Sequence, residues 1–194
     1  NRQPNFQRQL DRRRWEAAFF FEGAERSLLG LFFLYIFAEK IMSRVAFEIT
    51  QATASLAHFW QVWIASAVYW VELFFVFSGA THVALGLSLM VGLKLEENFN
   101  RPWAARNLIQ FWTRWHISLT SWVQDYIFRP IVAFSHKPWL AVFFSLLVIG
   151  LWHEFSIYYL LWALWQSLGI VLSRVLGRFT SDLNLPNWLG MIGG

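Results

Sequence analysis

The sequence predicts an all-α protein, a polytopic membrane helical bundle that includes re-entrant or interfacial amphipathic helices. Hydrophobic residues make up 57% of the 194 residues and charged residues only 14%, whereas soluble domains carry about 25% charged residues. Aromatic residues reach 20%, with 13 Trp, and Trp is enriched where helices meet the membrane interface. A soluble core could not bury this much apolar surface, so the composition favours a membrane protein.

The N-terminal part begins with a basic, polar segment, 1–26, which we interpret as an interfacial segment with a solvated face. The apolar stretch that follows, 27–47, has an uncharged part that covers only 27–38. Because a membrane span needs about 20 apolar residues, we expect a tilted span with one end at the interface, or a partly buried helix.

The clearest predicted span lies within the apolar run 55–91, whose one carboxylate is Glu72. Acidic groups inside a membrane usually face the interior of the bundle. As one helix the run would be roughly 55 Å long at 1.5 Å per residue, and the hydrocarbon core is about 30 Å thick. We therefore expect the helix to break near Gly79.

A polar loop, 92–108, leads into the segment 110–131, which is the most polar and most aromatic part of the chain. Plotted as one helix, 111–129 divides into an aromatic face with Trp112, Trp115 and His116 and a polar face with Arg114, Asp125 and Arg129. Asp125 and Arg129 are spaced for an i,i+4 pair. Such a helix is typical of a membrane interface or of the wall of a polar cavity.

The last predicted elements are a pair of apolar helices, 139–152 and 155–172, followed by Arg174 and Arg178. Charges orient the whole arrangement: with 1–26 in the cytoplasm, the segment 92–137 and the two C-terminal arginines fall on the same side. This distribution agrees with the excess of basic residues in cytoplasmic loops.

Several function classes find no support in the residues. The chain has no cysteine, which excludes disulfides, thiolate metal sites and a cysteine nucleophile. It has no G-x-S-x-G serine elbow and no glycine-rich phosphate loop, and its basic residues do not gather as in a nucleic-acid binder. We expect no metal and no tightly bound cofactor, because His58, His82 and His136 show no ligand spacing with the other histidines.

Two histidines are candidates for chemistry, His116 and His153. His116 fits either a structural histidine or a polar group beside a substrate path, and the pattern does not separate these. The run before His153, about 21 Å long as a helix, is too short to cross the membrane core, so we expect His153 and Glu154 inside protein or in a wet cavity. There His153 fits either a capped interfacial histidine or a general base, kept neutral by a low-dielectric pocket. Glu154 points about 100° away on a continuous helix, so the two do not form a dyad.

The chain resembles a known family in five segments that occur in the family's order. These are "LKLEENFNRPW" (93–103), "FWTRWHISLTSWVQDYIFRPI" (111–131) and "GLWH" (150–153), with "PNFQRQL" (4–10) and "FSG" (77–79). They resemble the membrane-bound O-acyltransferases (MBOAT), in the branch of alginate O-acetylases and teichoic-acid D-alanyl transferases. The resemblance covers about 1–172 and implies a fold of MBOAT type.

The resemblance also implies roles for residues. His153 matches the catalytic histidine of the family and His116 its second motif histidine, while Trp112, Trp115, Trp122 and Asp125 are expected to bind substrate along the acyl path. The chain departs from the family pattern at four positions, which are Val76, His82, Glu154 and Gln166. Because family chains are roughly twice as long, 1–194 is expected to be a single membrane-embedded domain from the central portion of a longer chain.

Two hypotheses follow from these residues. In the first, the protein is a multi-pass enzyme of the bacterial inner membrane that moves an acyl group to hydroxyls of an extracytoplasmic polysaccharide or glycopolymer. Its donor is an acyl-CoA or an acyl-carrier thioester on the cytoplasmic side, and its partners are the lipid bilayer, the donor carrier and polymer-modifying proteins. In the second, a catalytically degenerate MBOAT-like subunit serves as a scaffold in a membrane complex. Nucleic acid is not an expected partner of either.

Overall fold

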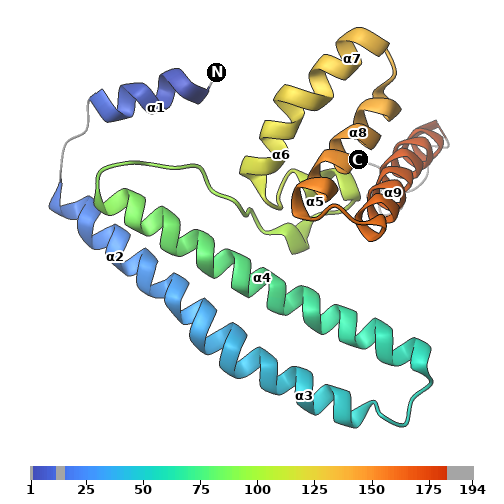
Figure 1. Ribbon diagram of the computed structural model, residues 1–194, viewed down its shortest axis with the longest axis horizontal. Coiled ribbons are helices and arrows are strands. Elements are labelled where there is room, and N and C mark those ends of the chain that lie inside the picture. Colours follow the sequence, from blue (N-terminus) through green and yellow to red (C-terminus); the bar gives the residue numbers. More distant parts are fainter. Residues whose placement is uncertain (1, 12–15, 183–194) are drawn as a thin grey trace. The chain divides into compact units, whose positions relative to one another are not determined.

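The computed structural model describes residues 2–11 and 16–182, and the regular elements in this part of the chain are all helices (Figure 1). The chain divides into two compact units, Asn1–Glu97 and Asn98–Gly194. Within residues 2–11 and 16–182, two helices are long and apolar enough to cross a membrane, His58–Met90 and Ile157–Leu176. The expected all-α membrane fold is confirmed, while the expectation of one membrane-embedded domain over 1–194 stays a prediction.

The first unit is built on a long helical hairpin. After α1 (Arg2–Asp11), one helical run passes through α2 (Ala17–Leu31), the π-type segment η1 (Phe32–Met42) and α3 (Ser43–Ala52). The second arm is α4 (His58–Met90), which lies alongside this run (Figure 1). The short uncharged stretch 27–38 therefore belongs to a longer helical run, and residues 17–26 of the expected interfacial segment also belong to α2.

Close glycine contacts hold α2 against α4. A Cβ atom added to Gly79 would lie 2.8 Å from the backbone oxygen of Gly30, and one added to Gly86 would lie 2.5 Å from that of Gly23. The predicted break near Gly79 is wrong, because α4 continues through this position for 33 residues, about 50 Å at 1.5 Å per residue. Gly79 lets two helix backbones approach, as small residues do in membrane bundles.

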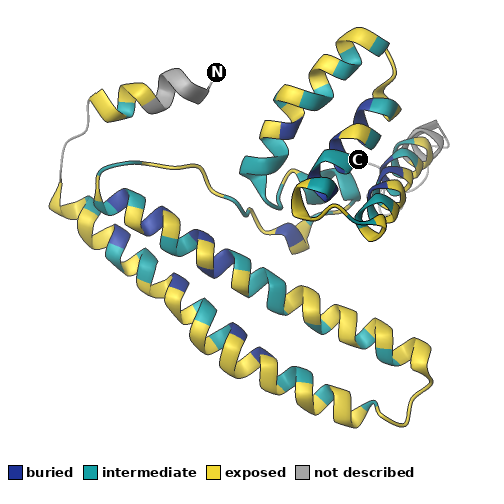
Figure 2. Cartoon of the chain, viewed as in Figure 1, coloured by how far each residue is buried: buried dark blue, intermediate teal, exposed yellow. Residues whose placement is uncertain are grey.

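The remaining surface of α4 carries large aromatic side chains. Buried residues of the hairpin gather where α2 meets α4, whereas the other half of α4 is mostly exposed (Figure 2). The exposed side chains there include Trp60, Trp63 and Trp70. Only 33% of the apolar window of α4 is buried, whereas the core helix of a soluble protein would be mostly covered. This exposure agrees with a helix that faces lipid.

The second unit contains the elements that hold the candidate site. They are η2 (Pro102–Ala104), α5 (Leu108–Trp112), α6 (Ile117–Val123), the π-type segment η3 (Gln124–Phe128), α7 (Arg129–Ser135), α8 (Pro138–His153) and α9 (Ile157–Asp182). The predicted loop 92–108 is confirmed over 92–107 apart from the short η2, because Leu108 already begins α5. The predicted pair 139–152 and 155–172 is confirmed as α8 and α9, with α9 starting at Ile157 and extending to Asp182.

The core of the second unit lies between α8, α9 and the end of α6. Its buried members are Val123, Val142, Leu146, Ile149, Ala163 and Ile170. Apolar side chains of α5 and α6 pack against this cluster. The core therefore fixes the end of α8, with His153, relative to the segment that contains His116.

The single helix predicted over 111–129 is wrong. α5 ends at Trp112, a turn covers 113–116, and a new helical run starts at Ile117. The division into two faces therefore holds only after Ile117, and Trp112 and His116 do not share one helix. The cause is His116, whose backbone adopts the left-handed conformation with φ 46° and ψ 55°, which a helix of L-residues does not accommodate.

Candidate functional site

His116 occupies a strained turn directly before α6. Left-handed backbone in a residue other than glycine, asparagine or aspartate costs on the order of 1–2 kcal/mol, and such strain persists only where the surroundings enforce it. Here the enforcing segment is 98–100. Phe99 and Trp115 form an isolated antiparallel β-bridge, and the Asn100 amide donates to the carbonyl of Arg114 at 3.0 Å. The turn is thus held from outside its own helix.

His153 is the last residue of α8, and the chain then turns sharply. Glu154 is extended, with φ −164°, so its side chain leaves the helix, and the prediction that it forms no dyad with His153 agrees with this geometry. The ring of His153 stacks on Tyr159, the third residue of α9, with centroids 5.7 Å apart and an interplanar angle of 11°. The stack fixes the orientation of the imidazole plane.

A close crossing of α8 and α9 makes this stack possible. A Cβ atom added to Gly150 would lie 3.1 Å from the carbonyl oxygen of Tyr159 and 3.4 Å from its Cβ atom. Gly150 is one turn before His153 on the same helix. A larger residue at this position would push Tyr159 away from the histidine.

Trp152 lies between the two histidines. Its ring is edge-on to His116, with centroids 6.0 Å apart, and edge-on to His153, with centroids 4.8 Å apart. The two predicted catalytic residues, 37 positions apart in the sequence, are therefore brought together around one indole. A pair of histidines at an aromatic wall can accept a proton at one ring and hold a polar substrate group at the other.

The surroundings keep both imidazoles neutral near pH 7. Burial, and to a smaller degree the neighbouring His153, lower the pKa of His116 to about 4. The side chain of His153 is only partly covered, and the desolvation of the covered part also lowers its pKa from the usual value near 6.5. Both shifts penalise the imidazolium, because the charged form loses hydration. A neutral ring is the form that accepts a proton.

His153 is more open than the sequence predicted. We expected it inside protein or in a wet cavity, but within the second unit its side chain is exposed. Two neighbours are also largely exposed, Trp152 at 62% and Phe155 at 88%. The reason is its position at the helix end, beyond the part of α8 that faces the core.

The four residues predicted to bind substrate separate into two groups, and their role stays a prediction. Trp112 lies edge-on to Trp162, with centroids 5.7 Å apart, and Trp115 stacks on Phe111 at 5.6 Å. Both belong to the aromatic cluster around the His116 turn. Trp122, in contrast, packs on Tyr126 in the next run of helix.

The fourth residue, Asp125, forms the predicted i,i+4 ion pair with Arg129, with Oδ1 and Nη1 2.7 Å apart. The side chain of Arg129 is 67% exposed and that of Asp125 35% exposed. The pair is therefore a surface contact within the described residues.

A cavity of about 180 Å³ opens beside the aromatic cluster in the second unit. Its walls include Trp112, Ile149 and Ser145, and Arg174 also lines it. Trp112 Nε1 and Ser145 Oγ are buried and have no hydrogen-bond partner within the described residues. Neither His116 nor His153 lines this cavity.

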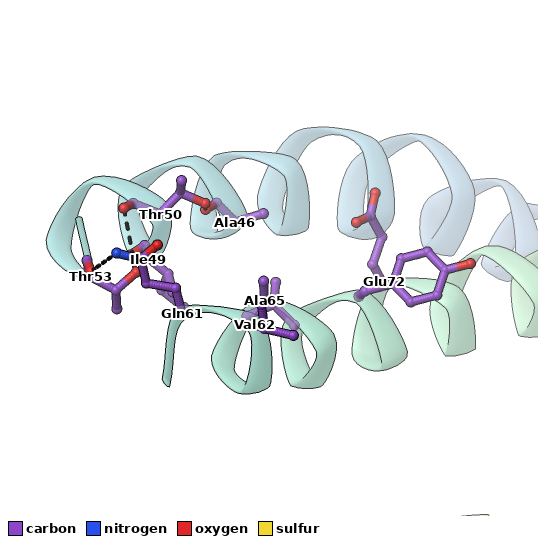
Figure 3. A pocket seen from close by; sticks show the side chains of 10 residues that line it. Ala46, Ile49, Thr50, Thr53, Gln61, Val62, Ala65 and Glu72 are labelled. Carbon is purple, nitrogen blue, oxygen red and sulfur yellow. Dashed lines mark hydrogen bonds between the residues drawn. The ribbon is translucent and has the colours of Figure 1, made fainter. Parts of the chain in front are cut away.

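The first unit has a larger pocket, of about 300 Å³, between α3 and α4 (Figure 3). Glu72 lines it, and so its carboxylate faces a space between helices, as expected for an acid in an apolar run. At the other end, Gln61 Nε2 donates to the carbonyl of Thr53 at 3.1 Å. The pocket contains no histidine.

The positions that depart from the family pattern have different surroundings. His82 lies edge-on to Phe33, with centroids 5.7 Å apart, and Val76 is 41% exposed. Gln166 Oε1 is buried without a hydrogen-bond partner among the described residues. Glu154 is exposed at the α8–α9 turn.

Sequence reasoning missed Tyr159, Trp152 and Asn98 as parts of the site. Trp152 adjoins the predicted histidine, so its neighbourhood carried a signal. Tyr159 could have been predicted only from the short turn 154–156, because a short turn makes the start of α9 pack against the end of α8. Asn98 contacts residues that lie 19 and 20 positions later in the sequence, and no local sequence pattern predicts these contacts.

Comparison with known proteins gives one family match and several relatives. The family model for MBOAT, the membrane-bound O-acyltransferase family, matches residues 9–192. The chain is 32% identical over 178 residues to "Probable alginate O-acetylase AlgI" of Pseudomonas fluorescens, which covers 87% of this chain and 34% of the relative.

Two further relatives are named for transfer to peptidoglycan and to teichoic acid. The peptidoglycan O-acetyltransferase of Helicobacter pylori is 31% identical over 156 residues, 78% of this chain and 29% of its own length. The teichoic acid D-alanyltransferase of Bacillus subtilis is 35% identical over 109 residues, 51% of this chain and 28% of its own length. The chain spans about a third of the length of the curated relatives that it matches.

Proposed function

The chain belongs to the membrane-bound O-acyltransferase family, and from this premise we propose that it forms the histidine-bearing part of an enzyme that transfers an acetyl-like acyl group to hydroxyls of a polysaccharide or glycopolymer. The observation that carries the proposal is the arrangement of His116 and His153 around Trp152. The relatives named above, which act on alginate, peptidoglycan and teichoic acid by their names, support the class of acceptor.

The proposed reaction needs one proton acceptor. Neutral His153 takes the proton of the acceptor hydroxyl as its oxygen attacks the carbonyl carbon of an acyl thioester. The tetrahedral intermediate collapses with cleavage of the carbon–sulfur bond, and the imidazolium returns the proton to the leaving thiolate. The products are the O-acyl ester and a free thiol, and the base ends in its starting form. General base catalysis of this kind contributes about 10²–10⁴ in rate.

His116 has a different role in this proposal. Its lowered pKa keeps the ring neutral. His116 therefore donates a hydrogen bond through its N–H and does not form an ion pair. Across Trp152 from His153, it orients the hydroxyl or the thioester carbonyl. We place Trp112 and Trp115 along the wall of the acyl path, because they line the same aromatic cluster.

The cellular setting is part of the same proposal. The enzyme is a multi-pass protein of the bacterial inner membrane, its donor is a cytoplasmic acyl-CoA or acyl-carrier thioester, and its acceptor lies outside. Its partners are the bilayer, the donor carrier and polymer-modifying proteins. Basic residues in the segment 92–137 and at Arg174 support a cytoplasmic side for these segments.

The second candidate function is a scaffold subunit without catalysis. The exposure of His153 favours it, since catalysis at a carbonyl gains from excluded water. A transfer assay separates the two. Membranes that contain the protein are supplied with a radiolabelled acyl thioester and the polymer, and label on the polymer is measured. More label on the polymer than in membranes without the protein supports the enzyme. If no label is transferred and deletion of the protein leads to loss of a membrane complex, the scaffold is supported.

A further inference from the structure

The N-terminal end of α6 is capped by a residue outside its own helix. The Ile117 amide donates to the backbone carbonyl of Asn98 at 3.0 Å, and the Ser118 amide donates to the side-chain Oδ1 of Asn98 at 3.1 Å. These are the first two amides of the helix, which have no acceptor within it. One asparagine, 18 residues before His116, thus satisfies both of them.

Because Asn98 caps α6, the side chain of His116 does not have to cap the helix that it precedes. The residue before a helix normally has extended backbone, and its side chain caps the second or third amide. His116 instead has left-handed backbone, and its side chain does not cap α6. Its ring lies edge-on to Trp152, on the side of His153. The capping function and the chemical function are carried by two different residues.

Contacts on both sides of His116 come from the same short segment. Before it, Phe99 is bridged to Trp115, and their rings are edge-on at 5.0 Å. After it, Asn98 holds Ile117 and Ser118. Because the left-handed turn is costly, it persists only while these contacts remain.

We propose that Asn98 is a positioning residue, which holds the left-handed turn at His116 and so aims the imidazole toward Trp152 and His153. The proposal rests on the proposed acyl transfer for its effect on rate, but its structural part stands on the hydrogen bonds alone. Asn98 touches no substrate in this account, and it acts through His116.

The test compares Asn98→Ala with Asn107→Ala. Asn107 caps α5 from the position directly before that helix, where its Oδ1 accepts from the Gln110 amide at 2.8 Å. Asn107→Ala therefore also removes one asparagine side-chain acceptor from a helix start, but at a helix that does not follow His116. Either substitution should lower helix stability to a similar extent. Asn98→Ala removes the side-chain acceptor of the Ser118 amide but keeps the backbone carbonyl that accepts from Ile117. Amide hydrogen exchange at 118 should therefore rise in Asn98→Ala and stay at the wild-type level in Asn107→Ala. Unchanged protection at 118 in Asn98→Ala would overturn the proposal without any activity assay.

A double-mutant cycle tests the coupling to His116. In the transfer assay, Asn98→Ala should lower the rate about as much as His116→Ala, and the double variant should be no slower than His116→Ala alone, as expected for residues that act as one unit. Asn98→Asp, which keeps an acceptor oxygen, should restore most of the rate above pH 7. Additive losses would show that Asn98 does not act through His116, whereas an inactive wild type would contradict the proposed function and leave the exchange result to decide the inference.

Discussion

The imidazole of His153 stacks on the phenol of Tyr159 with an interplanar angle of 11°. We expect Tyr159→Ala to lower acyl transfer about 3- to 10-fold, since an aromatic pair contributes about 0.5–1.5 kcal/mol beyond its buried area. Tyr159→Phe keeps the ring and should keep the rate. The matched control is Tyr158→Ala, because Tyr158 is 79% exposed. Equal losses in the Tyr158 and Tyr159 variants would show that the stack does not orient the base.

Gly150 sets the distance between the helices that carry these two rings. Alanine here meets the Tyr159 carbonyl at 3.1 Å, and the better helix propensity of alanine, about 1 kcal/mol, offsets this contact. Gly150→Ala should therefore change thermal stability little. Gly150→Val adds atoms that have no space and should destabilise the protein by about 1–3 kcal/mol. Thermal unfolding of the purified protein measures both, and a valine variant as stable as wild type would argue against the close crossing.

Features of the fold that depend on neighbouring residues could be predicted from the sequence, whereas features that depend on distant residues could not. Helix positions such as α8 and α9 could be predicted, because apolar runs bounded by polar turns determine them. The continuity of α4 through Gly79 could not, since the glycine is explained by Gly30 of another helix. The break before Ile117 was also hidden, because helical periodicity continues through a turn that distant Asn98 enforces.

The sequence indicated which residues belong to the candidate site better than it indicated how they are arranged. The motif residues His116 and His153 lie on either side of the Trp152 ring, while the roles that the resemblance implies for them stay predictions. Trp122 and Asp125 share the motif but project from a later turn, because the chain restarts its helix at Ile117. The exposure of His153 depends on where the core ends along α8, which a sequence pattern does not reveal.

Acid should destabilise the folded protein through His116. Its folded pKa of about 4 lies below the unfolded value near 6.5, so between these values the unfolded state binds more protons. Stability therefore falls as the pH drops from 6.5 toward 4. The unfolding temperature of wild type should fall more between pH 7.5 and pH 5 than that of His116→Gln. An identical fall in both proteins would mean that His116 titrates normally.

The ion pair of Asp125 and Arg129 should contribute little to stability. Exposed pairs are worth about 0–1 kcal/mol, and the Arg129 side chain is 67% exposed. Asp125→Ala should reach nearly the same level in membranes as Ser121→Ala, which removes a hydroxyl that donates to the Ile117 carbonyl one turn earlier in the helix. Immunoblots of membrane fractions compare the two, and selective loss of the Asp125 variant would mean that the pair is buried in the assembled protein.

The most direct test of the account is the loss of His153. The matched control is His136→Ala, since His136 is an exposed histidine of the same unit with left-handed backbone at the end of α7. With protein levels in the membrane equal, His153→Ala should lower acyl transfer to the polymer by about 10²–10⁴, and His116→Ala should lower it less. His136→Ala should transfer as wild type does. Transfer by His153→Ala at the wild-type rate would contradict the assignment of His153 as the base.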